Sequence, residues 1–365
     1  MKNTFLIAFI ALMALCSFAQ NDSTKYSFFV AGHTYGKPGV NNPGFHPPFK
    51  DKFNYIQSRT EIKFGVLTGD IVSPFPVAQD WDEIDADIDT LGLPVYFAVG
   101  NHDMENRPLF ESRYDSTYYH FVYENDLFIV LDPNIDGWNI SGNQLSFLKQ
   151  TLASNSENVS SIFIFFHQIL WKEVDNEFNY IRWNSSAGRH ESINFWSEVE
   201  PLFSDLDNQV IMFAGDLGAS WSSDVSYDKY DNITLISTGM GDEYGDNFII
   251  VNVKKDNSIK YDLICLSDTS LNCLGQLTDY QVVDMITNYH QYSTDPKNVD
   301  NIWTESLIEF ENPTLYIFDI QGKLVLEKKT SDQTKPVIKT NNIPPGFYIA
   351  KIIDNHHQMT IKFYK

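Results

Sequence analysis

The sequence predicts an α/β protein with a layered domain over residues 26–266 and a small all-β domain at its C-terminal end. Short apolar runs alternate with helical or loop segments through the first region, which is the pattern of layered α/β domains. Some runs, such as IFIFF at residues 162–166, are apolar at every position and therefore indicate strands covered on both faces. From Leu307 onward, short strands separated by Gly and Pro turns indicate a small β-sandwich.

The individual elements follow from these runs in chain order. Strands are predicted at 27–31, 63–68, 95–99, 127–131, 161–166, 209–213, 233–237, 248–253 and 261–266, and helices at 53–61, 80–91, 142–154 and 194–206. The polar connector contains a predicted helix at 280–289, and the last domain has predicted strands at 315–320, 324–326, 337–339, 347–353 and 359–364. Ligands of such sheets bind beyond the C-terminal ends of the strands, so those ends are where we expect a site.

The predicted domain boundaries divide the chain into four parts. Residues 1–19 read as a secretory signal peptide, because basic Lys2 precedes an apolar stretch at 5–15 and a small-x-small cleavage site at 17–19. Cys16 raises the possibility of a lipoprotein, but Leu15 is too large for the usual lipid-attachment signal. The layered α/β domain is expected at 20–266, the connector at 267–306 and the β-sandwich at 307–365. No later segment reaches the ~20 apolar residues that span a membrane.

The charge and the cysteines restrict the partners and the redox chemistry. The 365-residue chain carries a formal charge of −22, which argues against nucleic acid or anionic membrane as a general surface partner. So many acids favour solubility and give a weaker hint of affinity for divalent cations. Cleavage of the signal peptide leaves Cys265 and Cys273, which in an exported protein either pair across a short loop or stay as buried thiols.

Five predicted strands end in short polar motifs. The motifs are Ala31-Gly32-His33, Gly69-Asp70, Gly100-Asn101-His102-Asp103, His167 and Gly215-Asp216-Leu217-Gly218. Carboxylate, imidazole and amide groups are ligands for hard or borderline metal ions, and an imidazole also donates protons. Each motif alone is a modest signal, because Gly-Asp often only marks a turn. The ordered set, in which every member closes an apolar strand, predicts a metal site at one edge of the fold.

These motifs resemble those of the calcineurin-like metallophosphoesterases, whose pattern is Asp-x-His, Gly-Asp, Gly-Asn-His-Asp/Glu, a lone His and Gly-His-x-His. The resemblance covers about residues 26–266 and includes a strand at 129–132 followed by a helix that begins near Gln144-Leu145. It implies a two-sheet sandwich flanked by helices, with a two-metal centre at the sheet edges. It also implies hydrolysis of a small-molecule or polymer phosphoester.

The sequence departs from the family pattern at three positions. The family's first Asp falls on Ala31, and the two His residues of its last motif fall on Asp216 and Gly218. By resemblance, one metal ion keeps only His33 and Asp70 as ligands. The other keeps a complete set, listed here: Asp70, Asn101, His167 and Asp216. We therefore expect one or two divalent ions of Mn, Fe, Zn or Mg, and the oxygen-rich set favours the harder ions somewhat over Zn.

The remaining motif residues have expected roles in the chemistry. His102 is expected to donate a proton to the leaving group, and Asp103 to orient His102 through a hydrogen bond. His33 is expected to hold a weak second ion or to act as a base or substrate contact. The alternative for each residue is structural: a turn carboxylate, a loop cap or a satisfied core histidine. No substrate-binding residue is identified.

The C-terminal segment at about 308–365 resembles the type A sorting domains of the type IX secretion system. The matching features are residues 315–320 with Gly322-Lys323-Leu324-Val325, then Gly346-Phe347-Tyr348, and the closing Lys362-Phe363-Tyr364-Lys365. The resemblance implies that residues 307–365 engage the outer-membrane secretion machinery and that the protein is secreted or lies at the cell surface. The alternative is a β-sandwich that binds carbohydrate or protein.

Together these features predict a secreted, metal-dependent phosphoesterase-like hydrolase with an atypical centre of one or two ions. Two alternatives stay open. One is a binding protein that keeps the fold without catalysis, for which Ala31 and Gly218 are the best evidence. The other is a hydrolase of a non-phosphate ester, since no residue in the sequence is specific for a phosphate group.

Overall fold

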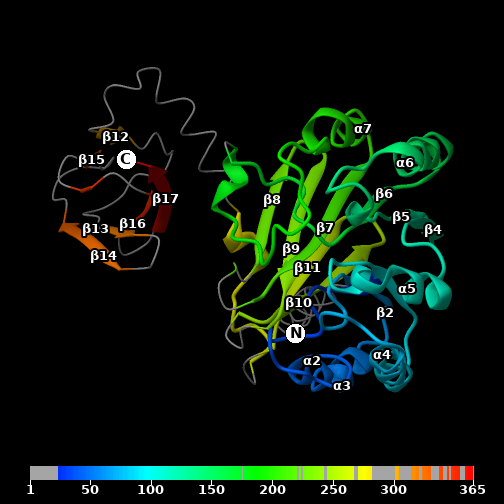
Figure 1. Cartoon of the computed structure of the whole chain (residues 1–365). Coiled ribbons are helices and arrows are strands. Elements are labelled where there is room, and N and C mark those ends of the chain that lie inside the picture. The colour runs from blue at the N-terminus through cyan, green and yellow to red at the C-terminus, as the bar shows by residue number, and fades with distance from the viewer. Residues whose placement is uncertain are drawn as a thin grey trace, which may run out of the picture. The chain divides into compact units, whose positions relative to one another are not determined.

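The computed structural model describes residues 24–174, 176–219, 222, 225–241, 245–266, 270–281, 301–303, 314–319, 323–329, 337–339, 343–344, 347–353 and 358–364. The chain divides into two compact units at Tyr280/Gln281, and each is described by itself (Figure 1). The predicted signal peptide at 1–19 lies outside the described residues, as does most of the predicted helix at 280–289.

The larger unit contains two mixed β-sheets. The first has the order β11-β10-β1-β2-β3 and the second the order β4-β5-β6-β7-β9-β8. The strands of the first are β1 (Thr24–Ala31), β2 (Ile62–Thr68), β3 (Val95–Ala98), β10 (Asn247–Lys254) and β11 (Ile259–Cys265). The strands of the second are β4 (Tyr119–Tyr123), β5 (Asp126–Val130), β6 (Ser161–Phe165), β7 (Gln209–Leu217), β8 (Ser226–Tyr230) and β9 (Ile233–Gly239).

Parallel strands form the centre of both sheets. β1, β2 and β3 run parallel in the first sheet, and β5, β6, β7 and β9 run parallel in the second. The outer strands β4 and β8 and the β10–β11 pair are antiparallel to their neighbours. Parallel strands place their C-terminal ends at one edge, so each sheet gathers the predicted motifs on one side.

The two sheets pack face to face through an aromatic core. Phe28 and Phe64 of the first sheet lie in one buried cluster with Phe128, Phe163 and Phe213 of the second. The ring centroids of Phe28 and Phe163 are 5.1 Å apart in an edge-to-face arrangement, and those of Phe28 and Phe128 are 5.3 Å apart. Edge-to-face aromatic pairs of this kind add to the gain from burial. The apolar runs predicted to be covered on both faces are indeed buried throughout.

Helices cover the outer face of each sheet (Figure 1). The helices on the first sheet are α2 (Pro47–Lys50), α3 (Phe53–Ser58), α4 (Ala78–Leu91) and α5 (Arg107–Tyr114); those on the second are α6 (Gly142–Asn155) and α7 (Pro201–Ser204). Local signals set the ends of α4: the Asp80 carboxylate accepts a hydrogen bond from Val77 N at 2.7 Å, and Gly92 follows the helix with φ of 69°. The predicted two-sheet α/β class is confirmed.

Several elements differ from the prediction. The predicted helix at 194–206 is broken into a π-turn at Phe195–Val199 and the short α7, because Pro201 has no N–H to continue the first hydrogen-bond pattern. The elements α5, β4 and β8 were not predicted. Each is short. β8 carries polar residues at three of its five positions, so its apolar signal is weak, and β4 has no fully buried position. A disulfide joins Cys265 at the end of β11 to Cys273, which resolves the two alternatives in favour of pairing.

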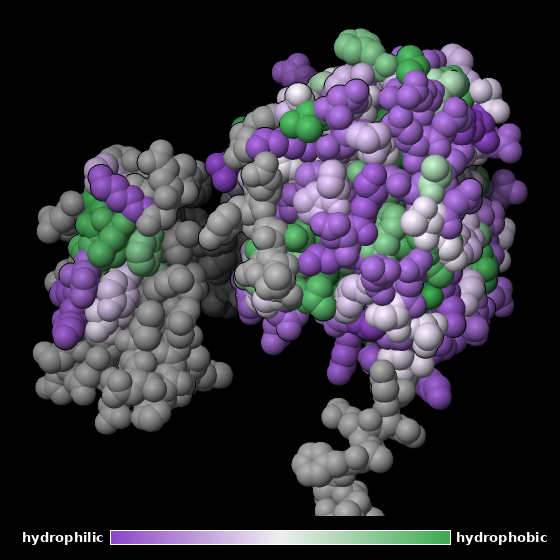
Figure 2. All heavy atoms as spheres, turned by 90° about the horizontal axis from the view of Figure 1, so that it is seen from below, coloured by the Kyte–Doolittle hydropathy of each residue, from purple (hydrophilic) through white to green (hydrophobic). Residues whose placement is uncertain are grey.

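The surface of the larger unit is mostly hydrophilic on the face seen in Figure 2, where hydrophobic residues form small separate spots. The most exposed large apolar side chains are Phe75 and Val174, at 81% and 82% exposure. No helix in the described part of the chain is both long enough and apolar enough to cross a membrane.

The C-terminal unit is all-β where it is described. A four-stranded antiparallel sheet has the order β14-β13-β16-β17, and a second sheet pairs β12 with β15. The strands are β12 (Asn301–Trp303), β13 (Thr314–Asp319), β14 (Leu324–Lys329), β15 (Val337–Lys339), β16 (Phe347–Ile353) and β17 (Gln358–Tyr364). Five of them match predicted strands, while β12 lies in the segment predicted to be a connector. Leu315, Ile317 and Ala350 form part of the buried interior.

Candidate metal centre

The motifs after β1, β2, β3 and β6 and the one at the end of β7 meet at one place, with Asp70 at the centre. The Nε2 atoms of three histidines surround Asp70 Oδ2: His167 at 3.5 Å, His102 at 3.6 Å and His33 at 3.9 Å. Asp216 Oδ1 lies 3.7 Å from His167 Nε2. All of these side chains except that of His102 are fully buried. The structure therefore brings five of the predicted site residues together from both sheets.

Glycines allow the strand ends to approach so closely. A Cβ on Gly215 would lie 1.9 Å from Thr68 O, and one on Gly32 would lie 2.5 Å from Gly215 Cα. Both distances are impossible for a side chain, so the main chains of β1, β2 and β7 touch directly. His33 and Asp70 have φ of 56° and 50°, in the left-handed region that non-glycine residues rarely adopt. Such strain is concentrated at functional sites, where the surrounding structure maintains it.

Three buried polar atoms of the cluster have no hydrogen-bond partner among the described residues: Asp70 Oδ2, His167 Nε2 and Asp216 Oδ1. The other atoms of the same groups are used. Asp70 Oδ1 accepts from His102 N at 3.0 Å, and His167 Nδ1 lies 2.8 Å from Thr68 O. Because a carbonyl oxygen only accepts, Nδ1 of His167 donates, which orients Nε2 toward the cluster. Orphaned buried atoms are costly, and a cation between them would satisfy all three.

The donor atoms of Asp70, His167 and Asp216 would fit around one ion if they moved slightly closer together. Among the described residues, no group of three His, Cys, Asp or Glu side chains has the geometry of a formed metal site. Ligand atoms about 2.1 Å from one ion lie about 3.0–3.4 Å apart. The separations of 3.5 Å and 3.7 Å from His167 Nε2 to the two carboxylates exceed that range by only a few tenths of an ångström. The donor set of Asp70, His167 and Asp216 therefore fits a divalent cation.

The electrostatics of the cluster show strong competition for protons. Burial opposes charge on His167, but the carboxylates of Asp70 and Asp216 outweigh it and raise its pKa to about 10. Burial also opposes ionisation of Asp70, yet the imidazoles of His167, His102 and His33 hold its pKa well below the usual range. Burial and the Asp70 charge raise the pKa of Asp216 to about 8, and burial lowers the pKa of His33 to about 4. One cation would replace the proton that these groups share.

Asp103 makes different contacts from those predicted. Its Oδ1 accepts from Ile71 N at 2.9 Å and Val72 N at 3.1 Å, and its Oδ2 accepts from Gly100 N at 2.8 Å. It therefore fixes the loop after Asp70 to the end of β3 and does not hydrogen-bond the His102 ring. Burial raises the pKa of Asp103 to about 6, and the Asp70 charge adds to this rise.

Glu105 occupies the position predicted for Asp103. Its Oε1 lies 3.3 Å from His102 Nδ1, while its Oε2 accepts a hydrogen bond from Phe75 N. The sequence carried a signal for this contact: residues three apart face each other in a 3₁₀ turn, and Asp103–Asn106 forms one. Adjacent residues, such as His102 and Asp103, point in different directions.

The other predicted positions have simpler surroundings. Asn101 is half-buried directly after β3 and next to His102. Ala31, where the family has Asp, is fully buried in the core between the first sheet and its helices. Gly218 has φ of 97°, and a Cβ there would lie 2.0 Å from Met240 N, so the local backbone admits only glycine. Neither Ala31 nor Gly218 offers a ligand, in line with the predicted loss of part of the second metal site.

Two further residues of the site were not identified from the sequence. Asn184, in the loop after β6, places Nδ2 2.6 Å from His33 Nε2, and its backbone N–H donates to Asp216 O at 2.9 Å. The ring of Tyr35 lies 4.4 Å from that of His33 and 5.6 Å from that of His102. The Asn184 contact joins residues 151 positions apart, so no local pattern encodes it. Tyr35 lies only two residues after His33, so its place in the site could have been inferred from the sequence.

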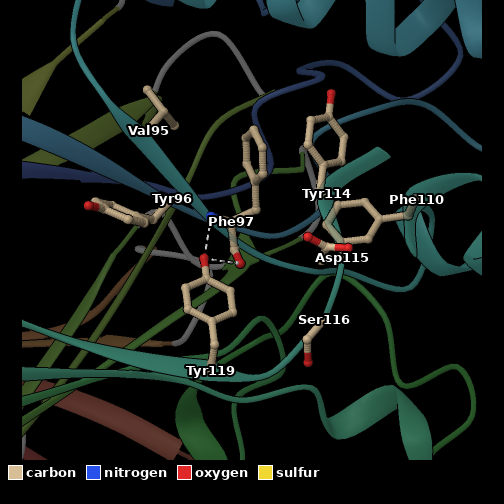
Figure 3. A pocket seen from close by; sticks show the side chains of 8 residues that line it. All are labelled: Val95, Tyr96, Phe97, Phe110, Tyr114, Asp115, Ser116 and Tyr119. Carbon is tan, nitrogen blue, oxygen red and sulfur yellow. Dashed lines mark hydrogen bonds between the residues drawn. The ribbon is translucent and has the colours of Figure 1, made fainter. Parts of the chain in front are cut away.

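A cavity of about 340 Å³ lies apart from these residues, at the start of β3 (Figure 3). It is lined by Val95, Tyr96, Phe97, Phe110, Tyr114, Asp115, Ser116 and Tyr119. In Figure 3 the Tyr119 hydroxyl points at the Phe97 backbone; it accepts from Phe97 N and donates to Phe97 O, both at 3.0 Å. The hydroxyl thus satisfies the backbone N–H and C=O of Phe97 at the edge strand β3, where no neighbouring strand pairs with them. None of the lining residues belongs to the predicted site.

Solved structures similar to this chain include several phosphatases. A dimetal phosphatase from Danio rerio has a TM-score of 0.49 at 14% identity and is matched over 66% of this chain and 96% of its own. A purple acid phosphatase from yellow lupin (Lupinus luteus) seeds has a TM-score of 0.49 at 14% identity, over 67% of this chain and 52% of its own. A putative 5′-nucleotidase from Staphylococcus aureus has a TM-score of 0.44 at 13% identity, over 67% and 55%. No curated protein matches the chain.

Family models match two parts of the sequence. Residues 33–200 match the model of the calcineurin-like phosphoesterases, and residues 297–365 match the secretion system C-terminal sorting domain. Both resemblances predicted from the motifs are confirmed. The chain is therefore similar to the calcineurin-like phosphoesterases over residues 33–200 and to the secretion system C-terminal sorting domain over residues 297–365.

Proposed function

We propose that this protein is an exported, metal-dependent hydrolase of phosphoesters, with Asp70, Asn101, His167 and Asp216 as the principal metal ligands. The observation that carries the proposal is the set of three buried, unpartnered atoms: Asp70 Oδ2, His167 Nε2 and Asp216 Oδ1. A folded protein seldom leaves three such atoms facing one another unless a ligand satisfies them. Carboxylate, imidazole and amide donors suit Mn, Fe and Mg, and Zn to a lesser degree.

A divalent ion bound here would supply a Lewis acid that polarises a phosphoryl oxygen. The protein supplies the remaining functions. Asp70 stays anionic because the surrounding imidazoles hold its pKa low. The His102 side chain is 21% exposed, so a substrate can reach it from solvent, and its Nε2 points into the cluster. His102 is therefore placed to give a proton to a leaving group, with Glu105 beside its other nitrogen.

Export and substrate class form the second part of the proposal. The match of residues 297–365 to a sorting domain supports passage across the outer membrane and a secreted or cell-surface location. We assign residues 20–266 to catalysis, 267–306 to a connector and 307–365 to recognition by the secretion machinery. The substrate would be a small-molecule or polymer phosphoester, in keeping with the phosphoesterase region at 33–200.

The proposal is tested with the purified full-length protein loaded with Mn²⁺. We expect hydrolysis of 4-nitrophenyl phosphate or bis(4-nitrophenyl) phosphate that depends on the metal and is abolished in Asp70→Asn. His102→Ala is expected to lower turnover of an alkyl phosphate by about 10²–10⁴-fold, the usual contribution of a general acid, and to affect the 4-nitrophenyl esters less because their leaving group needs little protonation. Equal turnover in wild type, Asp70→Asn and His102→Ala would show that the measured activity does not come from this site.

A second candidate function is binding without catalysis, and the specific observation in its favour is the loss of ligands at Ala31 and Gly218. A binding protein would take up metal or phosphoester but would hydrolyse neither 4-nitrophenyl phosphate nor bis(4-nitrophenyl) phosphate. Metal-dependent hydrolysis of 4-nitrophenyl acetate alone would instead favour a carboxylic ester as the natural substrate.

A further inference from the structure

Phe75 combines high exposure with a strained backbone close to the candidate metal centre. The residue is 81% exposed, and its φ of 60° lies in the left-handed region that a bulky residue rarely adopts. It belongs to the loop 71–77, here called the Phe75 loop, which directly follows Asp70 and leads from β2 to α4. An exposed phenyl ring gains nothing from core packing, and strained backbone persists only where the surrounding structure holds it. The fold therefore keeps this ring in solvent at a cost in conformational energy.

The Phe75 loop is fixed to the 3₁₀ turn that follows β3. At the start of the loop, Asp103 Oδ1 accepts a hydrogen bond from Ile71 N at 2.9 Å, and near its end Asn106 Nδ2 donates to Pro76 O at 3.0 Å. A proline on each side of Phe75 fixes two further φ angles. The position of Phe75 is therefore set by polar contacts and prolines rather than by burial of its ring.

One carboxylate joins Phe75 to the proposed proton donor. Glu105 Oε2 accepts a hydrogen bond from Phe75 N, and Glu105 Oε1 lies 3.3 Å from His102 Nδ1. The main chain of Phe75 and the ring of His102 are thus separated by the width of a single carboxylate group. Because His102 is the group that meets the leaving group in the proposed reaction, Phe75 lies on the leaving-group side of the site.

The surroundings of His102 on this side are largely apolar. The Phe75 loop contains no charged residue, and Val77 at its end is 57% exposed. The ring of Tyr35, from the loop after β1, contacts the His102 ring edge to face with centroids 5.6 Å apart. The Phe75 loop and Tyr35 therefore offer apolar contact area and aromatic faces to a leaving group, and no charge.

We propose that Phe75 binds the leaving group of the phosphoester and that this leaving group carries a planar aromatic ring. The inference rests on the proposed function, because hydrolysis at the metal centre defines the leaving group. An aromatic ring that stacks on Phe75 removes apolar surface of both rings from water, and the aromatic pair adds to that gain. Because the loop is already held in place, its residues lose little conformational entropy when the ligand binds.

The test compares the binding of two non-hydrolysable phosphonates to the purified, Mn²⁺-loaded full-length protein by calorimetric titration. Benzylphosphonate has a methylene group in place of the ester oxygen of phenyl phosphate, and ethylphosphonate has a methyl group in place of the ring. The variants are Phe75→Ala, which removes the ring, and Phe75→Tyr, which keeps it. Val122→Ala is the matched control, since Val122 is 50% exposed on β4, a strand that carries none of the predicted site residues. Thermal unfolding shows whether each variant is folded.

Phe75→Ala is expected to bind benzylphosphonate about 10-fold more weakly than the wild type and to bind ethylphosphonate with unchanged affinity. Phe75→Tyr and Val122→Ala are expected to match the wild type with both ligands. A folded Phe75→Ala that binds benzylphosphonate as tightly as the wild type, or that weakens both ligands equally, overturns the inference and leaves the proposed function intact.

Two other results separate this inference from the proposed function. A wild type that binds neither phosphonate contradicts both. A wild type that binds benzylphosphonate through Phe75 but hydrolyses neither 4-nitrophenyl phosphate nor bis(4-nitrophenyl) phosphate supports the recognition of an aromatic ring and contradicts the proposed hydrolysis.

Discussion

Glu105 Oε1 lies 3.3 Å from His102 Nδ1, whereas Asp103, the neighbour of His102 in sequence, hydrogen-bonds only backbone amides. The two acids therefore divide two tasks. Glu105 fixes the ring of the proposed proton donor, and Asp103 fixes the loop that presents Asp70.

Exchange of the two acids for their amides separates these tasks. Asp103→Asn is expected to cost about 2–4 kcal/mol of unfolding free energy, because it removes a charged acceptor shared by three buried backbone N–H groups. Glu105→Gln is expected to leave stability nearly unchanged and to lower kcat on poor leaving groups such as alkyl phosphates, with little effect on 4-nitrophenyl phosphate. Urea unfolding and turnover on both substrate types measure this. The opposite pattern, with Glu105→Gln unstable and Asp103→Asn inactive but stable, would show that Asp103 orients the His102 ring.

Metal binding is expected to release protons. In the metal-free protein His167 and Asp216 have pKa values of about 10 and about 8, so both hold a proton at pH 7. An ion at this site must displace them, so apparent affinity rises with pH between 7 and 10, by about tenfold per pH unit for each proton displaced. Calorimetric titration with Mn²⁺ in two buffers of different ionisation enthalpy counts the released protons. Identical enthalpies in both buffers would contradict the assignment.

The raised pKa of His167 makes the stability of the metal-free protein depend on pH. The folded pKa of His167 lies above its ordinary value of 6.5, so the ion pair with Asp70 contributes fully to stability below pH 6.5. That contribution is lost as the pH rises through about 10. Bound metal removes this dependence, because the proton is already gone.

Tyr119→Phe is expected to lower the unfolding free energy by about 1–2 kcal/mol, because the Phe97 N–H and C=O lose their partner at the edge of β3. The phenyl ring would still fill the same space, so packing beside the cavity is retained. Chemical denaturation of the two proteins measures the difference, and Tyr118→Phe serves as control because Tyr118 does not line the cavity. Equal stability of Tyr119→Phe and wild type would show that water replaces the hydroxyl without loss.

The Cys265–Cys273 disulfide closes a loop with a sequence separation of 8. A cross-link over so short a loop contributes about 2–3 kcal/mol by restricting the unfolded chain. The double variant Cys265→Ala, Cys273→Ala is therefore expected to unfold at a lower temperature than the oxidised wild type and to be insensitive to reducing agents. A wild type whose melting temperature is the same with and without dithiothreitol would contradict this.

The fold was predictable wherever a strand or helix has a strong apolar pattern. The strands through 161–166 and 209–213 were identified because burial demands apolar residues at most of their positions. The helix α6 was identified because Leu145, Leu148 and Leu152 recur at helical spacing. The edge strand β4 was missed because none of its positions is fully buried, and β8 was missed because three of its five residues are polar. The break at Pro201 was visible in the sequence, since proline cannot continue a hydrogen-bonded helix.

The site was predictable in part for a similar reason. Asp70, His102, His167, His33 and Asp216 each directly follow or end a strand, so topology alone brings them together. The contacts of Glu105 and Asn184 depend on how loops fold over that edge. Glu105 follows a local 3₁₀ spacing, but Asn184 meets His33 across 151 residues, and no spacing rule encodes such a contact.

The metal content of the purified full-length protein tests the central claim most directly. Elemental analysis after loading with Mn²⁺, Fe²⁺ or Zn²⁺ should find at least one tightly bound equivalent, and Asp70→Asn should lose it, because Asp70 Oδ2 is the atom around which the histidines gather. The control variant Asn125→Ala, at an exposed residue of the β4–β5 turn that hydrogen-bonds Ser160, should retain it. Absence of bound metal in the wild type with every ion, or equal retention in a folded Asp70→Asn, would contradict the account.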